Sequence, residues 1–186
     1  MNRYNDVFHE EIVVRKNRGI YNVLYIVLNI FMYIFAILAI ISFQGILRSF
    51  SDTSTLINAV VIFLGFAIVA VGSYLYKDTL KMDYEYSYTN GIFDVARVKN
   101  NKTRKELLSC NTKEELELVA PIMTNDFNRY QSMNDIKKVN AWLNRDMKKY
   151  FAIIRKDSQR TMLIFEPSEK FIATLKKYSP QKVKTQ

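Results

Sequence analysis

The residues best placed for chemistry are five cations around one predicted turn: Arg97, Lys99, Lys102, Arg104 and Lys105. Strands are predicted on both sides of that turn, so the five side chains can gather at one hairpin tip. Anionic lipid headgroups or an acidic partner would suit the tip, because each Lys or Arg near an anionic leaflet contributes about 1 kcal/mol. A basic exposed hairpin also protects a sheet edge from aggregation and keeps a domain soluble, and this role is the alternative.

Positive charge continues beyond this tip. Residues 77–186 contain 22 Lys and Arg against 14 Asp and Glu, and so carry +8 of the chain's net +9. A second basic set is more scattered: Lys137, Lys138, Arg145, Lys148 and Lys149. Lipid and nucleic acid both attract such charge, and the apolar segments described below favour anionic lipid over nucleic acid.

No catalytic residue, metal site or cofactor is expected. The sequence has no Gly-rich phosphate loop, no Cys/His metal spacing and no nucleophile elbow. His9 and Cys110 are each the only residue of their type, and Cys110 follows two leucines in a predicted strand, where it is expected to be a small buried side chain. One cysteine excludes an internal disulfide, which suits a cytoplasmic domain. We therefore predict a protein without enzymatic activity.

Two apolar runs precede the basic segment and determine where it is held. Residues 20–43 and 56–76 contain no Asp, Glu, Lys or Arg. About 20 helical residues cross a hydrocarbon core of about 30 Å, so both runs predict transmembrane helices, joined by an extracytoplasmic loop over 44–55. The first run is longer than the apolar region of a signal peptide, typically about 7–15 residues.

The orientation follows from the cations that flank the two runs. The first flank holds Arg3, Arg15, Lys16 and Arg18, the connecting loop holds only Arg48, and the second flank begins with Lys77 and Lys81. Cytoplasmic flanks carry the excess of Lys and Arg. The prediction is a multi-pass plasma-membrane protein with both termini in the cytoplasm.

A stripe of small and amide residues runs along each predicted span. Asn22, Asn29 and Ala36 recur every seven residues in the first, and Gly65 and Gly72 do so in the second. Seven residues are about two helical turns, so each set shares one face. Small residues allow close helix approach and buried amides bond across helices. The stripes are expected to form a helix–helix interface, within the hairpin or with a homo-oligomer or another partner.

The segment before the first span predicts a short amphipathic helix. Within residues 5–19, Asp6 can cap the helix, Phe8 and Ile12 are four residues apart, and Gly19 can end it. Domain 1–19 is therefore expected to be a cytoplasmic juxtamembrane helix that lies in the membrane interface, and the alternative is a solvated cytoplasmic extension.

The segment 77–186 predicts a mainly antiparallel β domain of about seven strands. Strands are expected over 84–88, 92–98, 104–110, 115–119, 136–142, 149–156 and 160–166, with a short helix over 125–132. Asn90-Gly91 is a strong hairpin signal. A closing amphipathic helix follows Pro167 and ends at Pro180. The expected core is Tyr86, Ile92, Leu107, Ile153, Leu163, Phe165, Phe171 and Leu175.

Four stretches are similar to a family of small bacterial two-span membrane proteins catalogued as a domain of unknown function. They are residues 5–16 (NDVFHEEIVVRK), 84–95 (YEYSYTNGIFDV), 119–121 (VAP) and 163–170 (LIFEPSEK). The pattern at Tyr86, Thr89 and Asn90 also resembles the first hairpin of bacterial pleckstrin-homology domains. The resemblance implies an α+β architecture, a transmembrane hairpin followed by a pleckstrin-homology-like domain, and it implies no activity.

The function expected from these observations is a non-enzymatic, membrane-anchored module that binds protein or anionic lipid at the inner leaflet. The alternative is a small accessory subunit of a membrane transport or export complex, docked through the helix stripes.

Overall fold

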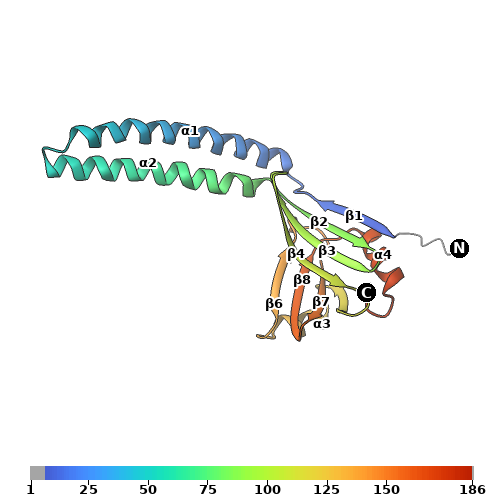
Figure 1. Ribbon diagram of the computed structural model, residues 1–186. Helices are drawn as coiled ribbons and strands as arrows, with labels where there is room; N and C mark the ends of the chain where they lie inside the picture. The colour runs from blue at the N-terminus through green and yellow to red at the C-terminus, as the bar shows by residue number, and fades with distance from the viewer. Residues whose placement is uncertain (1–6, 186) are drawn as a thin grey trace. The chain divides into compact units, whose positions relative to one another are not determined.

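The computed structural model describes residues 7–185 and divides the chain into two compact units (Figure 1). One unit is a helical hairpin over residues 17–82. The other combines the chain before the hairpin, up to Lys16, with the chain that follows from Asp83. The second unit is thus built from both ends of the sequence.

The helical unit consists of α1 (Arg18–Arg48) and α2 (Thr53–Leu80). With 31 and 28 residues, they are about 46 and 42 Å long. Both are long and apolar enough to cross a membrane, and only 6% of the most apolar window of each is buried. Because these windows are not covered by protein, the helices suggest a membrane protein.

The connection between the helices is shorter than the predicted loop over 44–55. Helix α1 continues to Arg48, and α2 already begins at Thr53, so only residues 49–52 connect them. Asp52 caps α2, because its carboxylate accepts hydrogen bonds from the backbone N–H groups of Ser54 and Thr55 at 3.3 and 3.1 Å. Local capping and continued hydrogen bonding extended both helices past the limits that hydropathy indicated.

Small side chains lie where the two helices meet. Ala39 of α1 and Ala70 and Ser73 of α2 are the buried residues around the middle of the hairpin. Aromatic rings pack across it, with centroids 5.9 Å apart for Phe35 and Phe66 and 5.8 Å for Phe43 and Phe63. The hairpin therefore has a contact face of its own.

The strand unit contains two four-stranded sheets. Sheet A has the order β1-β2-β3-β4, formed by β1 (Phe8–Val13), β2 (Met82–Thr89), β3 (Ile92–Lys99) and β4 (Thr103–Asn111). Sheet B has the order β5-β7-β8-β6, formed by β5 (Leu116–Pro121), β7 (Tyr150–Lys156), β8 (Gln159–Phe165) and β6 (Lys137–Ala141). Strand β6 pairs with β8 in parallel, whereas the pairs β1–β2, β3–β4, β5–β7 and β7–β8 are antiparallel. Two helices complete the unit, α3 (Asn125–Gln131) and α4 (Glu169–Tyr178).

The main core lies where the sheets and α4 meet. The rings of Tyr86, Phe93, Phe165 and Phe171 contact one another with centroids 5.5–6.0 Å apart. Phe151 anchors a second cluster, against which Phe127 and Tyr130 of α3 pack. The predicted core members are buried except Ile92, which is 37% exposed, and Leu107, which is half-buried.

The predicted helix over residues 5–19 is wrong, because this segment forms strand β1. Exposed and half-buried residues alternate along it, which is the period of a strand. Phe8 and Ile12 share a face in a strand as well as in a helix, so their spacing did not discriminate. Pairing with β2, from Phe8↔Thr89 to Val13↔Tyr84, decided the outcome. Asp6, the expected cap, and Arg3 lie outside the described residues.

The turn predicted at Asn90-Gly91 is confirmed by backbone geometry, and Asp157 and Ser158 turn in the same way between the strands predicted over 149–156 and 160–166. Asn90 and Gly91 have φ values of 50° and 96°, and Asp157 and Ser158 have 48° and 67°. Both central residues of each two-residue turn are thus left-handed, as a type I′ hairpin requires. Strands β2–β3 and β7–β8 form where the sequence predicted them.

Candidate functional site

The five predicted cations do lie around one hairpin, formed by β3 and β4. The register pairs Arg97 with Lys105, Val98 with Arg104 and Lys99 with Thr103. Asn100 and Asn101 turn the chain with positive φ angles of 49° and 52°. We call Arg97, Lys99, Lys102, Arg104 and Lys105 the basic tip.

The sheet divides the basic tip between two faces. Directly paired residues share a face, so Arg97, Lys99 and Lys105 point to one side and Arg104 to the other. Burial raises the pKa of Tyr84, and the positive charges of Arg97 and Arg15 partly offset that effect. Arg97 therefore lies on the Tyr84 side of the sheet, which is its inner face.

Arg104 lies instead among carboxylates on the outer face. Its Nε donates a hydrogen bond to Glu85 Oε2 at 2.8 Å. That hydrogen bond is the main cause that raises the pKa of Arg104, and the charges of Glu106 and Asp94 add to it. Arg104 is therefore a compensated charge, and four of the five cations remain for an anionic ligand.

The basic tip lies at the end of sheet A where the chain leaves and re-enters the domain. Strand β1 ends at Val13, opposite Tyr84 near the start of β2. Strand β3 follows β2 through the turn at Asn90 and Gly91, so its last residue, Lys99, returns to that same end. Antiparallel order thus brings the tip to the tethered end of the sheet.

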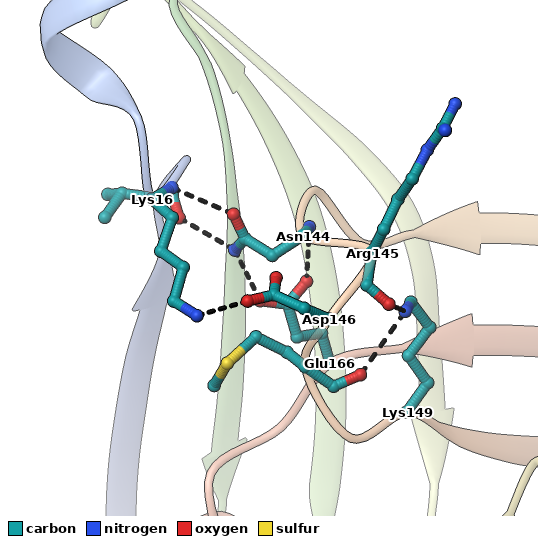
Figure 2. Close-up of polar contacts among 8 residues, drawn as sticks. Lys16, Asn144, Arg145, Asp146, Lys149 and Glu166 are labelled. Atoms are coloured by element: carbon teal, nitrogen blue, oxygen red, sulfur yellow. Dashed lines mark hydrogen bonds and ion pairs between the residues drawn. The ribbon is translucent and has the colours of Figure 1, made fainter.

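Figure 2 shows a polar clamp at this end, between the last residues before α1 and the β6–β7 loop. Asn144 accepts a hydrogen bond from the backbone N–H of Lys16 at 2.8 Å and donates one to the carbonyl of Val14 at 3.1 Å. The ammonium group of Lys16 pairs with the carboxylate of Asp146. Asn144 and Asp146 could not be predicted as contacts from the sequence, because they belong to no periodic pattern.

Glu166 holds the loop in this position. It is 5% exposed, and its Oε2 accepts from the backbone N–H groups of Leu143 and Asn144 at 3.1 and 2.9 Å. Its Oε1 accepts from Asn144 Nδ2 at 2.5 Å. A buried carboxylate with three donors is satisfied without a cation. The sequence signal that could have identified Glu166 is its position directly after an apolar strand and before Pro167.

The second predicted basic set is separated by the fold. Lys149 is 9% exposed, and its ammonium group donates to the carbonyls of Arg145 and Met147 at 2.7 and 3.3 Å. It also lies 4.7 Å from the centroid of the Trp142 ring. Arg145 and Lys148 are exposed on the β6–β7 loop. Lys137 and Lys138 lie at the opposite end of β6.

Neither His9 nor Cys110 is arranged as a nucleophile. Burial raises the pKa of the Cys110 thiol to about 12, so the thiol is protonated at neutral pH. His9 Nδ1 lies 2.7 Å from Thr174 Oγ1, and its ring meets Phe171 edge-on. Across residues 7–185, no group of three or more His, Cys, Asp and Glu side chains could hold a metal ion.

In the helical unit, the predicted interface residues separate into two groups. Asn29 lies inside the hairpin, where its Oδ1 accepts a hydrogen bond from the Lys77 ammonium at 3.0 Å, and Asn22 and Ala36 are half-buried. Gly65 and Gly72 are exposed, and a Cβ added to either would meet nothing within 4 Å. The prediction that these two glycines pack within the hairpin is therefore wrong. Ala70 and Ser73 occupy the contact face instead.

Comparison with known proteins connects the strand unit and the hairpin to one family. The model of the family described as "Bacterial PH-like domain (DUF6106)" matches residues 5–185, which is nearly the whole chain. No curated protein and no solved structure matches.

Proposed function

Since this chain belongs to the bacterial PH-like domain family DUF6106, we propose that it is a non-enzymatic, membrane-anchored module whose basic tip contacts anionic lipid headgroups. The observation that carries this proposal is the position of the tip at the tethered end of sheet A. The chain passes from Val13 to Arg18 and from Leu80 to Met82 at that end. The cations therefore lie at the end of the sheet from which the chain continues into both helices.

The pairing of β1 with β2 supports placing both flanks on one side of the membrane. Val13 precedes α1 and pairs with Tyr84, which follows α2. A two-helix hairpin between paired strands must return to the side from which it started. Lys and Arg in both flanks favour the cytoplasm for that side, and with it the inner leaflet of the plasma membrane.

The strength of the proposed contact follows from its charges. Arg97, Lys99, Lys102 and Lys105 remain after Arg104 is compensated by Glu85. At about 1 kcal/mol for each cation near an anionic surface, this contact is weak for a free domain. Attachment to a membrane helix makes it effectively intramolecular, so a weak contact is sufficient to orient the domain.

The proposal is tested with the full chain in nanodiscs. An environment-sensitive dye is attached to Thr103→Cys, at the exposed start of β4, in a Cys110→Ser background. Nanodiscs of phosphatidylcholine are compared with nanodiscs that also contain phosphatidylglycerol. We expect a blue shift only with the anionic lipid. It should fade as the Debye length falls from about 10 Å at 0.1 M salt to about 3 Å at 1 M.

Changing Arg97, Lys99, Lys102 and Lys105 to Gln should abolish the shift. The matched control changes four exposed lysines elsewhere on the domain to Gln: Lys113, Lys156, Lys170 and Lys177. This control loses the same charge and should keep the shift. A tip variant that shifts like the wild type, or a control that loses the shift equally, would overturn the proposal.

An accessory subunit of a membrane transport or export complex is the second candidate. Gly65 and Gly72 are exposed on α2 with open space around them, and small residues on an open helix face permit close approach of another helix. Purification from native membranes in mild detergent tests this candidate. A co-purifying membrane complex that is lost in the double variant Gly65→Ile, Gly72→Ile would support it, and an unchanged complex would contradict a role for these glycines.

A further inference from the structure

The outer face of sheet A carries exposed apolar side chains on its edge strand. Phe8 is 65% exposed and Ile12 is 56% exposed, and both belong to β1. The register places Phe8 beside Thr89 and Ile12 beside Glu85, so the face extends onto β2. Ile92 of β3, which is 37% exposed, continues it. Large apolar side chains grouped on an exposed face are typical of interaction surfaces.

Carboxylates surround these apolar side chains. Glu10 lies between Phe8 and Ile12 on the same side of β1. Glu85, Asp94 and Glu106 act together on Arg104 from the neighbouring strands. The outer face thus carries these four carboxylates beside the single guanidinium of Arg104, on a chain whose net charge is +9. The outer face of sheet A is an acidic region on a basic protein.

This combination decides which class of partner fits. An anionic leaflet would be repelled by the carboxylates, so the outer face cannot serve the same ligand as the basic tip. A protein segment matches both features when every second residue, the set that lies on the outer face, is in turn apolar and Lys or Arg. Strand β1 is the edge of sheet A, so its outer backbone groups are positioned to pair with an added strand.

The opposite edge of sheet A is less suited to such a segment. Lys105 lies on β4 and Lys102 in the turn before it, and both would repel cationic side chains. A cavity of about 340 Å³ beside β4 is lined by Lys137 and Lys156 as well as by Glu106 and Asp157. Because its lining carries both positive and negative side chains, this cavity favours neither a cationic nor an anionic partner. On the described strands of sheet A, the acidic and exposed apolar side chains come together on the outer face of β1, β2 and β3.

We propose that the edge strand β1 and the outer face of sheet A bind an extended, basic segment of a partner protein by strand addition. The apolar side chains of that segment cover Phe8 and Ile12, and its cations meet Glu10 and Glu85, while Asp94, farther along the face, adds to the negative potential. This site is separate from the basic tip, whose uncompensated cations serve the lipid contact.

The test uses the full chain in nanodiscs of neutral phosphatidylcholine. The probe is a fluorescent nine-residue peptide, Val-Thr-Lys-Thr-Val-Thr-Lys-Thr-Val, which places Val and Lys in turn on one face of a strand. The same peptide with Glu in place of Lys is its matched control. Fluorescence anisotropy, corrected with empty nanodiscs, gives the two Kd values. We expect at least tenfold tighter binding of the basic peptide, weakening as salt is raised. Equal Kd values for the two peptides would overturn the proposal.

Variants locate the binding site. One double variant, Phe8→Ser with Ile12→Ser, removes the apolar side chains, and another, Glu10→Lys with Asp94→Lys, reverses the charge. Each should weaken binding at least tenfold while the melting temperature of the domain is retained. The controls are Met123→Ser, at a side chain 95% exposed, and Glu114→Lys with Asp135→Lys at two other exposed acids. Both should bind like the wild type. Unchanged binding in the β1 variants would overturn the proposal.

Two further outcomes separate this inference from its alternatives. The tip variant, with Arg97, Lys99, Lys102 and Lys105 changed to Gln, should still bind the basic peptide, so the lipid contact and the protein contact can fail independently. The chain could instead dimerise without peptide, and this dimer could dissociate in the variant Glu10→Lys with Asp94→Lys. In that case the occupant of the site is a second copy of this chain, and the proposed partner is wrong.

Discussion

The carboxylate of Glu11, on β1, holds Ser168 at the start of α4. The backbone N–H of Ser168 donates to both carboxylate oxygens, at 2.8 and 3.1 Å, and its hydroxyl donates to Oε2 at 2.6 Å. The Ser168 hydroxyl also caps α4 by accepting from the backbone N–H of Phe171 at 3.2 Å. The segment before the membrane helices thus holds the final helix of the domain.

We expect Ser168→Ala to destabilise the domain, because it removes a helix cap worth about 0.5–2 kcal/mol together with the hydroxyl bond to Glu11. Glu11→Ala should have an effect in the same direction. Urea denaturation followed by tryptophan fluorescence of Trp142 measures both. Glu10→Ala is the matched control, because Glu10 points to the exposed face of the same strand. Equal unfolding midpoints for Glu10→Ala and Glu11→Ala would contradict this role.

A second prediction concerns the limits of the domain. Strands β1 and β2 are neighbours, so a short Gly/Ser linker in place of residues 17–82 can join Lys16 to Asp83. This shortened chain should be soluble and cooperatively folded. Residues 83–186 alone should unfold at a lower urea concentration, because sheet A loses its edge strand and Tyr84 and Tyr86 lose their cover. Equal unfolding midpoints of the two chains would show that β1 is dispensable.

A third prediction follows from the packing of the hairpin. Ala70→Leu should lower the melting temperature of the full chain in detergent, since Ala70 is 9% exposed in the contact face and extra volume there forces the helices apart. Gly65→Leu should not, because nothing lies within 4 Å of an added Cβ. A larger loss for Gly65→Leu than for Ala70→Leu would place Gly65 in an interface between chains.

The orientation gives a fourth prediction. In a Cys110→Ser background, single cysteines are introduced at Ser51, between the helices, and at Gln181, after α4, where both native residues are exposed. An impermeant maleimide on intact cells should label Ser51→Cys and not Gln181→Cys. After the cells are broken, both positions should react. Labelling of Gln181→Cys on intact cells would reverse the orientation.

The fifth prediction concerns pH. Burial raises the pKa of the Cys110 thiol above its ordinary value, to about 12. Because the folded-state pKa is higher than the unfolded one, near 8.5, the stability that this thiol contributes is fully present below that pH. It is lost as pH rises from there toward 12. We expect Cys110 to resist a thiol reagent at pH 8 until urea unfolds the domain. Rapid labelling of the folded chain would contradict its burial.

Most of the strand unit could be predicted from sequence because local signals agreed with the tertiary structure. The tyrosines of β2 alternate inward, and Asn90-Gly91 adopts the left-handed conformations that its hairpin requires. Helix α4 buries Phe171 and Leu175 as its apolar stripe indicated. In each case the sequence of a single element specifies both its backbone conformation and the face that it buries.

By itself, the sequence determined the two long apolar helices, the strands from β2 to β8 and the concentration of positive charge after the hairpin. Only the tertiary structure decided that residues 8–13 form a strand, because Phe8 and Ile12 are compatible with two conformations until β2 pairs with them. It also decided that Arg104 is compensated by Glu85 and that Gly65 faces outward. Pairing, charge compensation and helix contact depend on which distant residues meet, and one-dimensional spacing does not contain that information.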